Sequence, residues 1–376
     1  MPNDIESRSL TLVILEGSFL VALNILSLTG NILVCLSVYR NPRLHTPTNL
    51  YIIALAVSDL LSAVFVMPLG EIVLFSGKWQ FGETICQLHA FISLFIIYVS
   101  PATMSLTAVN RYVRICRPSI SYQKIFSHRK SRLWLASVWF FVACYIAIPR
   151  IANWQGFEFV PGYAQCSIKH LGEKAKFIHY LIVLTVFLAL PLFATTFCYT
   201  KVLKAIRQHK MGILPSLSQR RRNEARITVQ EIKLSRSLFI VVFTFMSCWI
   251  PLWVIVVLRR LVIMNMPRNV ELLCMFFLYI SNTVNPAIYS GMNSAFRSEF
   301  RRIITCKSNN LVTSQSSQRR NSHPGVELGL ITSWLRGARV EALHDNGLEN
   351  AHQEASHKGN TLAQIQNKTY LHIPTR

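Results

Sequence analysis

The sequence predicts an all-α membrane protein, a bundle of seven transmembrane helices followed by a short amphipathic eighth helix. Its 376 residues are 51% hydrophobic and only 15% charged, whereas about 25% charged residues are usual in soluble domains. Seven apolar stretches approach the roughly 20 helical residues that cross a bilayer core. Backbone polar groups in lipid must be satisfied within each segment, so we expect helices. The stretches are Gly17–Tyr39, Thr46–Leu69, Leu88–Val109, Leu133–Pro149, Phe177–Thr200, Ser237–Leu258 and Leu272–Met292.

Lys and Arg residues in the connections predict the orientation. They are concentrated after the first, third and fifth stretches, as in Arg40, Arg43 and the basic segment 201–236. The opposite connections carry fewer of them, and Glu158 and Glu173 dilute their charge. The positive-inside rule then predicts that the N-terminus is outside and the C-terminus inside. We expect a multi-pass protein of the plasma membrane, with an extracellular N-terminus and a cytoplasmic C-terminus. The formal charge of +22 therefore indicates membrane lipid as a partner, and no nucleic acid.

Three parts are expected along the chain. Residues 1–11 form a short extracellular N-terminus, residues 12–306 the seven-transmembrane domain with its amphipathic helix, and residues 307–376 a disordered cytoplasmic tail. The segment Asn293–Cys306 separates apolar residues from arginines at helical spacing, which is typical of a helix in the membrane interface. Cys306 is a candidate for lipidation. The tail is rich in Ser, Asn, Gln and His and has little apolar periodicity.

Two of the nine cysteines, Cys86 and Cys166, fall on the predicted outer side. An oxidising exterior favours a disulfide between them, which would tie the second outer connection to the start of the third helix. The alternative is a pair of free thiols. Most of the other cysteines lie within the spans, where they are expected to be small packing residues.

Asp59 is the only fixed charge inside the apolar stretches. A carboxylate at that depth should face the bundle interior and find a polar partner, for which Ser100, Asn282 and Asn285 are candidates. Such a group suits a hard monovalent cation such as sodium, or the storage of a proton. It also suits a hydrogen-bond network that only holds the helices together.

The third apolar stretch ends abruptly in Asn110-Arg111-Tyr112. The simplest interpretation is a stop at the cytoplasmic interface, with the arginine side chain snorkelling into water. The alternative is a switch that contacts an intracellular partner. Glu231, at the inner start of the sixth helix, either pairs with Arg111 and restrains an inactive state or is a solvated charge.

Three prolines, Pro191, Pro251 and Pro286, lie inside predicted helices. Each removes an intrahelical hydrogen bond and bends its helix. One interpretation is a set of tolerated kinks. The other is a set of hinges for helix movement, which the neighbouring aromatic residues favour: Tyr199, Trp249 and Tyr289.

Together these motifs resemble one family, the rhodopsin-like (class A) G-protein-coupled receptors, over about residues 12–306. The chain shows them in this order: Gly30-Asn31, Leu55–Asp59, Cys86 with Arg111 one helix later, Trp139, Pro191 with Tyr199, Cys248–Pro251 and Asn285–Tyr289.

Within that class, several segments are similar to melatonin receptors: Leu28–Val34, Leu36–Asn41, Asn110–Tyr112 followed by Ile115-Cys116, and Phe296-Arg297 leading to Arg301–Ile304. Three positions depart from the melatonin-receptor pattern. Phe187 stands where those receptors have a histidine, Pro149 or Arg150 where they have an asparagine, and Pro286 where they typically have an alanine.

The resemblance implies roles for the switch residues. Arg111 would engage a heterotrimeric G protein when the sixth helix swings outward. Trp249 and Phe245 would transmit ligand occupancy, and Tyr199 and Tyr289 would stabilise the active state. The resemblance also implies arrestin and receptor kinases as partners of the tail.

A second set of implied roles concerns ions and charge. Asp59, Ser100 and Asn285 would form an allosteric sodium site, and no other cofactor is expected. The family usually has an Asp or Glu before the arginine, where this chain has Asn110. The local carboxylate restraint on Arg111 is then lost, which would raise basal activity.

The resemblance places a ligand pocket in the outer half of the bundle. Receptors for biogenic amines have an aspartate where Ser93 stands, and opsins have a lysine where Tyr279 stands, so neither class is favoured. The remaining pocket is apolar and aromatic, as expected for a small neutral lipophilic ligand. Its expected lining is Ser93, Leu94, Ile97, Val183, Phe187, Trp249, Leu252, Trp253, Val256, Met275 and Tyr279.

Other functions stay open at this point. A short peptide is the alternative ligand, because charged residues surround the expected mouth: Glu71, Arg150, Arg259, Arg260 and Glu271. A transporter or channel is a further alternative, although such proteins usually show internal repeats and several polar or broken helices. A membrane enzyme is not expected, because no His, Asp and Glu set converges in the spans.

Overall fold

The computed structural model describes residues 8–210, 229–258 and 266–305. It contains seven helices that are long and apolar enough to cross a membrane, each of 24 to 36 residues. The predicted seven-helix fold is confirmed. The helices are α1 (Leu10–Arg40), α2 with α3 (Pro47–Leu61 and Met67–Ser76), α4 (Gly82–Cys116), α6 (His128–Ile151), α7 with α8 (Glu173–Ile182 and Leu190–Lys210), α10 (Val229–Val257) and α11 (Arg268–Met292).

Most helices continue beyond the apolar stretches that predicted them. The third stretch, expected over Leu88–Val109, belongs to a helix that runs from Gly82 to Cys116. Hydrophobicity marks only the part of a helix that lies in hydrocarbon. Polar turns at each end keep their helical hydrogen bonds without adding to that signal.

Two spans change their hydrogen-bond pattern just before a proline. The π-helical segment η3 (Ser62–Val66) joins α2 to α3, and the Met67 N–H reaches the Ser62 carbonyl five residues back. The π-helical segment η5 (Val183–Ala189) joins α7 to α8, and Leu190 bonds in the same way to Thr185. Pro68 and Pro191 follow and have no N–H to donate. The wider turn absorbs the interruption without breaking the span.

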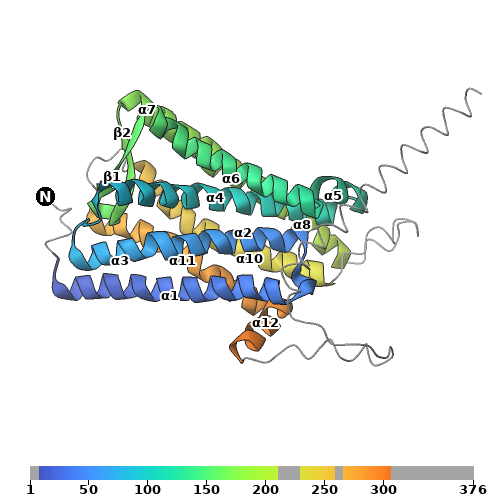
Figure 1. Cartoon of the computed structure of the whole chain (residues 1–376). Coiled ribbons are helices and arrows are strands. Elements are labelled where there is room, and N and C mark those ends of the chain that lie inside the picture. Colours follow the sequence, from blue (N-terminus) through green and yellow to red (C-terminus); the bar gives the residue numbers. More distant parts are fainter. Residues whose placement is uncertain (1–7, 211–228, 259–265, 306–376) are drawn as a thin grey trace, which may run out of the picture. The chain divides into compact units, whose positions relative to one another are not determined.

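A small β-hairpin, which we did not predict, lies in the connection between α6 and α7. Strands β1 (Gln155–Val160) and β2 (Gln165–His170) pair antiparallel, with Phe159 opposite Cys166. Figure 1 shows the hairpin at the end of the bundle where α1 begins. The predicted disulfide is confirmed, since Cys86 and Cys166 are bonded across a Cα–Cα distance of 5.5 Å. The hairpin is thereby fixed to the start of α4.

Two short helices lie toward the opposite end of the bundle (Figure 1). One is α5 (Ser119–Phe126), which we did not predict. The other is α12 (Ser294–Ile304), the predicted amphipathic helix, which the Asn293 side chain caps. Phe296 is fully buried and packs on Tyr289 at a ring distance of 5.7 Å. Cys306 and the predicted tail lie outside the described residues.

Gly30 allows α1 and α11 to approach each other closely. A Cβ atom at this position would lie 2.9 Å from Pro286 Cγ and 3.0 Å from its Cβ. Next to it, Asn31 Nδ2 donates to the Asn282 carbonyl at 3.1 Å. Gly30 therefore leaves room for the proline ring of α11, and Asn31 links α1 to that helix by a hydrogen bond.

We predict that Gly30→Ala lowers the free energy of unfolding by about 1–3 kcal/mol, because the added methyl overpacks a rigid proline ring. Elsewhere in a helix the same exchange is stabilising by about 0.5–1 kcal/mol. Gly291→Ala is the matched control, since nothing lies within 4 Å of its Cβ position. Thermal unfolding of the purified protein should distinguish these two variants. Adding Pro286→Ala should restore the stability that Gly30→Ala loses. Equal shifts of the unfolding temperature in both variants would contradict the close packing of Gly30 on Pro286.

Candidate functional site

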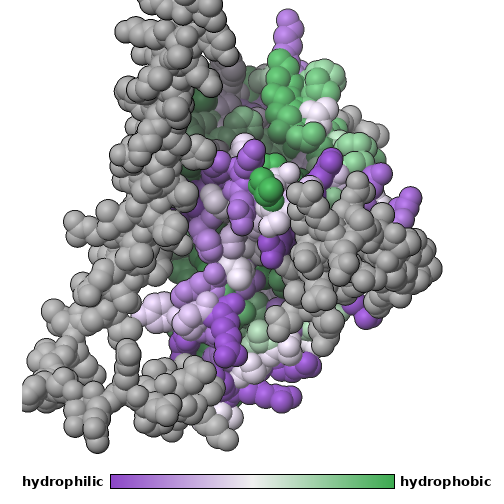
Figure 2. Space-filling model, turned by 90° about the vertical axis from the view of Figure 1, so that its right-hand side faces the viewer, coloured by the Kyte–Doolittle hydropathy of each residue, from purple (hydrophilic) through white to green (hydrophobic). Residues whose placement is uncertain are grey.

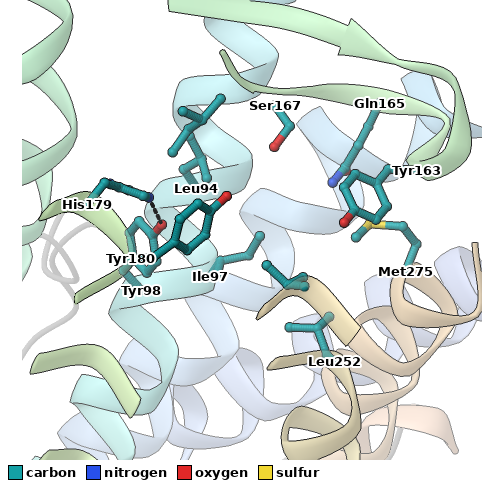
Figure 3. Close-up of a pocket in the computed structure, with 12 residues that line it drawn as sticks. Leu94, Ile97, Tyr98, Tyr163, Gln165, Ser167, His179, Tyr180, Leu252 and Met275 are labelled. Atoms are coloured by element: carbon teal, nitrogen blue, oxygen red, sulfur yellow. Dashed lines mark hydrogen bonds between the residues drawn. The ribbon is translucent and has the colours of Figure 1, made fainter. Parts of the chain in front are cut away.

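A pocket opens at the hairpin end of the bundle, where α4, the hairpin, α7, α10 and α11 meet (Figure 3). Five residues of the expected lining contribute to it, namely Leu94, Ile97, Leu252, Val256 and Met275. Tyr98, Tyr163, Gln165, Ser167, Ile168, His179 and Tyr180, which we did not predict, complete the wall.

The other expected lining residues are buried around the pocket and do not line it: Ser93, Val183, Phe187, Trp249, Trp253 and Tyr279. Ser93 Oγ donates to Gln165 Oε1 at 3.5 Å, so the hairpin covers it. The hairpin residues have one sequence signal that could have found them. Gln165, Ser167 and Ile168 flank Cys166, and a disulfide to the third helix holds that cysteine over the bundle.

The polar part of the pocket wall is organised around His179. Its Nε2 lies 3.4 Å from the Tyr98 hydroxyl, and its Nδ1 lies 3.0 Å from the Tyr145 hydroxyl. A neutral imidazole has one donor and one acceptor nitrogen, so one phenol donates to it and the other accepts from it. The Tyr145 hydroxyl also donates to the His179 carbonyl at 3.5 Å. The Tyr98 hydroxyl keeps a further hydrogen-bonding position, and Tyr98 lines the pocket, as Figure 3 shows.

Aromatic rings continue from Tyr98 into the centre of the bundle. The Tyr98 ring lies 6.3 Å from Trp253 and stacks on it at 16°. Trp253 lies 6.5 Å from Trp249, and Trp249 stacks on Phe245 at 4.6 Å. Trp249 Nε1 also donates to Ser281 Oγ of α11 at 3.1 Å. Trp249 is therefore one layer below the pocket and connects to it through other rings.

Asp59 is buried where α2 faces α11. Asn285 Nδ2 donates to Asp59 Oδ2 at 3.0 Å, so one of the three expected partners is engaged. Ser100 Oγ is buried and has no hydrogen-bond partner among the described residues. Hard cations take carboxylate and neutral oxygen ligands of this kind. Asp59 supplies a single negative charge, and the described residues contain no cluster of three or more His, Cys, Asp or Glu side chains.

Asn110 holds Arg111 at the opposite end of α4. Arg111 is only 2% exposed, so the expected snorkelling into water is wrong for this residue. Its Nη2 donates to Asn110 Oδ1 at 3.1 Å, and Thr48 Oγ1 donates to the same oxygen at 3.0 Å. Asn110 Nδ2 in turn donates to the Tyr122 hydroxyl at 3.3 Å. A neutral amide thus links α2, α4 and α5 around the arginine.

The remaining predicted switch residues surround this end of the bundle. Tyr112 packs on Phe197 of α8 at a ring distance of 6.0 Å, and Tyr199 packs on Phe239 of α10 at 5.6 Å. Tyr199 and Tyr289 are buried, and their hydroxyls have no hydrogen-bond partner in the part of the chain that the structure describes. The Glu231 side chain lies outside the described residues, so its expected pairing with Arg111 stays a prediction.

Comparison with known proteins agrees with this architecture. Residues 30–289 match the family model described as 7 transmembrane receptor (rhodopsin family). The crystal structure of squid rhodopsin superposes with a TM-score of 0.69, over 82% of this chain and 91% of that chain, at 24% sequence identity.

Among curated proteins, the chain is similar to melatonin receptors. It is 28% identical to melatonin receptor type 1C of Xenopus laevis over 284 residues, 74% of this chain and 65% of that receptor. It is 27% identical to melatonin receptor type 1A of Mus musculus over 285 residues, 74% of this chain and 77% of that receptor. With a family match over most of its length, a seven-helix fold and the disulfide in place, the chain belongs to the rhodopsin family of seven-transmembrane receptors.

Proposed function

We propose that this receptor transmits the binding of a small, uncharged, largely apolar ligand to a heterotrimeric G protein. The ligand occupies the pocket beneath the β1–β2 hairpin, on the extracellular side with the N-terminus. The G protein binds at the opposite, cytoplasmic end, around Arg111. The observation that carries the proposal is the unbroken series of rings from Tyr98 through Trp253 and Trp249 to Phe245, which joins the pocket to the core of α10.

The pocket chemistry supports an uncharged ligand. Its polar groups are phenols, an amide, a hydroxyl and an imidazole, and among the described residues no Asp, Glu, Lys or Arg lines it. A charged ligand group would lose its hydration there without gaining an ionic partner. The Tyr98 hydroxyl, which His179 positions, supplies a hydrogen bond to the ligand. The relatives described above are named melatonin receptors, so melatonin is the first compound to test.

The charged residues near the mouth favour a small ligand over a peptide. Glu271 is fully buried, and a Cβ on Gly162 of the hairpin turn would lie 1.4 Å from its Oε2. Arg150 Nε donates to Gln87 Oε1 at 3.2 Å. Glu271 therefore lies inside the protein, and Arg150 is partly buried and bonded to α4. Arg259 and Arg260 lie outside the described residues.

Helix movement would couple the two ends. α10 and α11 contain Pro251 and Pro286, where the missing backbone hydrogen bonds allow the helices to bend. A ligand that shifts the Tyr98 ring would push on the Trp253 ring stacked against it. Because Trp253 belongs to α10, that helix would move. Release of Arg111 from Asn110 would then present the guanidinium to the G protein. Arrestin and receptor kinases at the tail, and a lipid on Cys306, belong to the same proposal.

The function is tested by guanine-nucleotide exchange on purified G proteins, with a screen of melatonin, related indoles, lipids and short peptides. We expect Arg111→Ala to abolish ligand-driven exchange and to leave ligand binding intact, whereas Arg43→Ala, at an exposed arginine, serves as the control. Tyr98→Phe should weaken binding about three- to tenfold, the effect of losing one hydrogen bond. Ligand-driven ion flux without exchange would refute the receptor function.

Basal activity provides a second prediction. In Asn110→Asp, the Arg111 guanidinium would bond to a carboxylate, and such a charge-assisted hydrogen bond is roughly twice as strong as a neutral one. The inactive arrangement gains stability, so ligand-free exchange should fall about fivefold, equivalent to about 1 kcal/mol. Asn110→Leu removes the hydrogen-bond acceptor of Arg111 and should raise ligand-free exchange. Unchanged or higher basal exchange in Asn110→Asp would contradict this role of Asn110.

A sodium ion held by Asp59, Ser100 and Asn285 would stabilise the inactive receptor, as an ion does that binds one of two states. We expect NaCl to lower ligand-free exchange more than KCl at equal concentration, and Asp59→Asn to remove the difference. Thr283→Val on the same helix is the control, since the Thr283 hydroxyl donates to the Leu23 carbonyl of α1. If the wild-type protein responds equally to both salts, the Asp59 network is structural and no sodium site exists.

A further inference from the structure

The hydrogen atoms of the His179 cluster follow from its contacts. Each phenol, Tyr98 and Tyr145, has one proton to donate, and a neutral imidazole has one more on either ring nitrogen. The contacts that can take these protons are Nε2 with Tyr98 at 3.4 Å, Nδ1 with Tyr145 at 3.0 Å and the His179 carbonyl with Tyr145 at 3.5 Å. Buried donors nearly always have an acceptor. The arrangement that gives all three protons an acceptor is therefore favoured.

The His179 carbonyl can take one of these protons because α7 passes into the π-helical segment η5 just beyond it. The Val183 N–H is shared between the carbonyls of His179 and Tyr180. A carbonyl oxygen has two lone pairs, so the His179 oxygen can also accept from Tyr145 of α6. Packing keeps that phenol in place, since its ring stacks on His179 at 15° and lies 4.8 Å from Phe187.

One tautomer of His179 gives every proton an acceptor. With the ring proton on Nδ1, the imidazole donates to Tyr145, Tyr145 donates to the carbonyl, and Tyr98 donates to Nε2. With the ring proton on Nε2, Tyr145 donates to Nδ1 and the imidazole donates to Tyr98, whose own proton is then left over. Within the described ranges, the Tyr98 hydroxyl has no other hydrogen-bond partner. The Nδ1–H tautomer is therefore the favoured one.

This tautomer decides what Tyr98 offers to a ligand. The Tyr98 proton points at His179, so the oxygen keeps a lone pair and has no proton for the pocket. Figure 3 shows this hydroxyl beside His179, among the residues that line the pocket. A ligand N–H or O–H group would donate to that oxygen. A ligand carbonyl or ether oxygen would meet another acceptor there and lose its hydrogen bond to water without replacing it.

We infer that His179 determines which ligands the pocket prefers, because it holds the Tyr98 hydroxyl as a hydrogen-bond acceptor. The preferred ligand is an uncharged, largely apolar molecule with an N–H or O–H donor, and this selection is called here the donor preference. The inference rests on the proposed function, which places the ligand in this pocket. His179 acts through Tyr98 and is a positioning residue. Tyr145 acts one step farther back and is not among the lining residues.

The tautomer can be measured without a ligand. In the full-length receptor, labelled with nitrogen-15 histidine and held in lipid bilayers at neutral pH, solid-state NMR distinguishes protonated from unprotonated ring nitrogens. The variant His179→Gln identifies the His179 signals among those of the 11 histidines. We expect a proton on Nδ1 and none on Nε2. A proton on Nε2 would overturn the inference.

Two probes of the same shape test the donor preference. Indole presents an N–H group, whereas benzofuran has an ether oxygen in the same place. In thermal-shift titrations of the purified receptor, indole should bind about three- to tenfold more tightly, the effect of one hydrogen bond. In Tyr98→Phe the two probes should bind about equally. Equal binding of both probes to the wild type would contradict the donor preference.

Tyr145→Phe separates positioning from packing. In this variant Nδ1 has lost its contact with the phenol, so His179 can carry its proton on Nε2 and donate to Tyr98. The preference for indole should disappear or reverse, although the changed residue does not line the pocket. A residue that served only in packing would weaken both probes by the same factor, and that result would refute the inference.

The matched control is Tyr39→Phe, the same exchange at a phenol that is 71% exposed in the last turn of α1. Figure 2 looks onto that end of the bundle, where hydrophilic side chains gather. This variant should keep the full preference for indole. Loss of the preference here as well would show that it does not depend on the His179 cluster.

Failure of the proposed function would give a different pattern. If no ligand drives nucleotide exchange, the G-protein function falls, while the tautomer and the probe preference stand. If neither probe binds, the pocket is not the ligand site, and the donor preference falls together with that part of the proposed function. If both probes bind equally, the donor preference alone is wrong.

Discussion

Every backbone N–H and C=O group inside the hydrocarbon must find its partner within the protein, and the structure depends on this constraint. It dictates helices for the seven spans, and it makes each proline inside them a local problem. Pro68 and Pro191 follow π-helical segments in which the preceding residue bonds five positions back. Pro286 fits against Gly30, where the absence of a Cβ leaves room for its ring. The chain thus keeps continuous spans and places points of bending in them.

The same constraint applies to buried polar side chains, which also need hydrogen-bond partners within the protein. Neutral side chains and charged side chains meet it differently. Asn31 and Trp139 donate to neighbouring helices, the second to Thr103 Oγ1 at 3.3 Å. Asp59 and Arg111 each find a neutral amide, Asn285 and Asn110. A neutral partner holds a charge more weakly than an opposite charge does. The carboxylate of Asp59 is therefore held less tightly by Asn285 than it would be by a cation.

The two ends of the bundle differ in how they are closed. At the hairpin end, the disulfide to α4 fixes β2 over the pocket, and aromatic rings fill the space below it. At the other end, Asn110 connects α2, α4 and α5 around Arg111. α10 connects the two ends, because Trp253 stacks on Tyr98 of the pocket wall and Phe239 packs on Tyr199.

The sequence by itself determined the seven spans, the disulfide, the amphipathic helix and the family, because span length and motif spacing are local properties of the chain. It did not determine the pocket lining. Trp249 and Phe187 were expected there and lie behind it, while Tyr98, His179 and the hairpin residues form the wall. Nor did it show Arg111 buried against Asn110. These features depend on helix rotation and on where a loop folds back, which only contacts between distant segments decide.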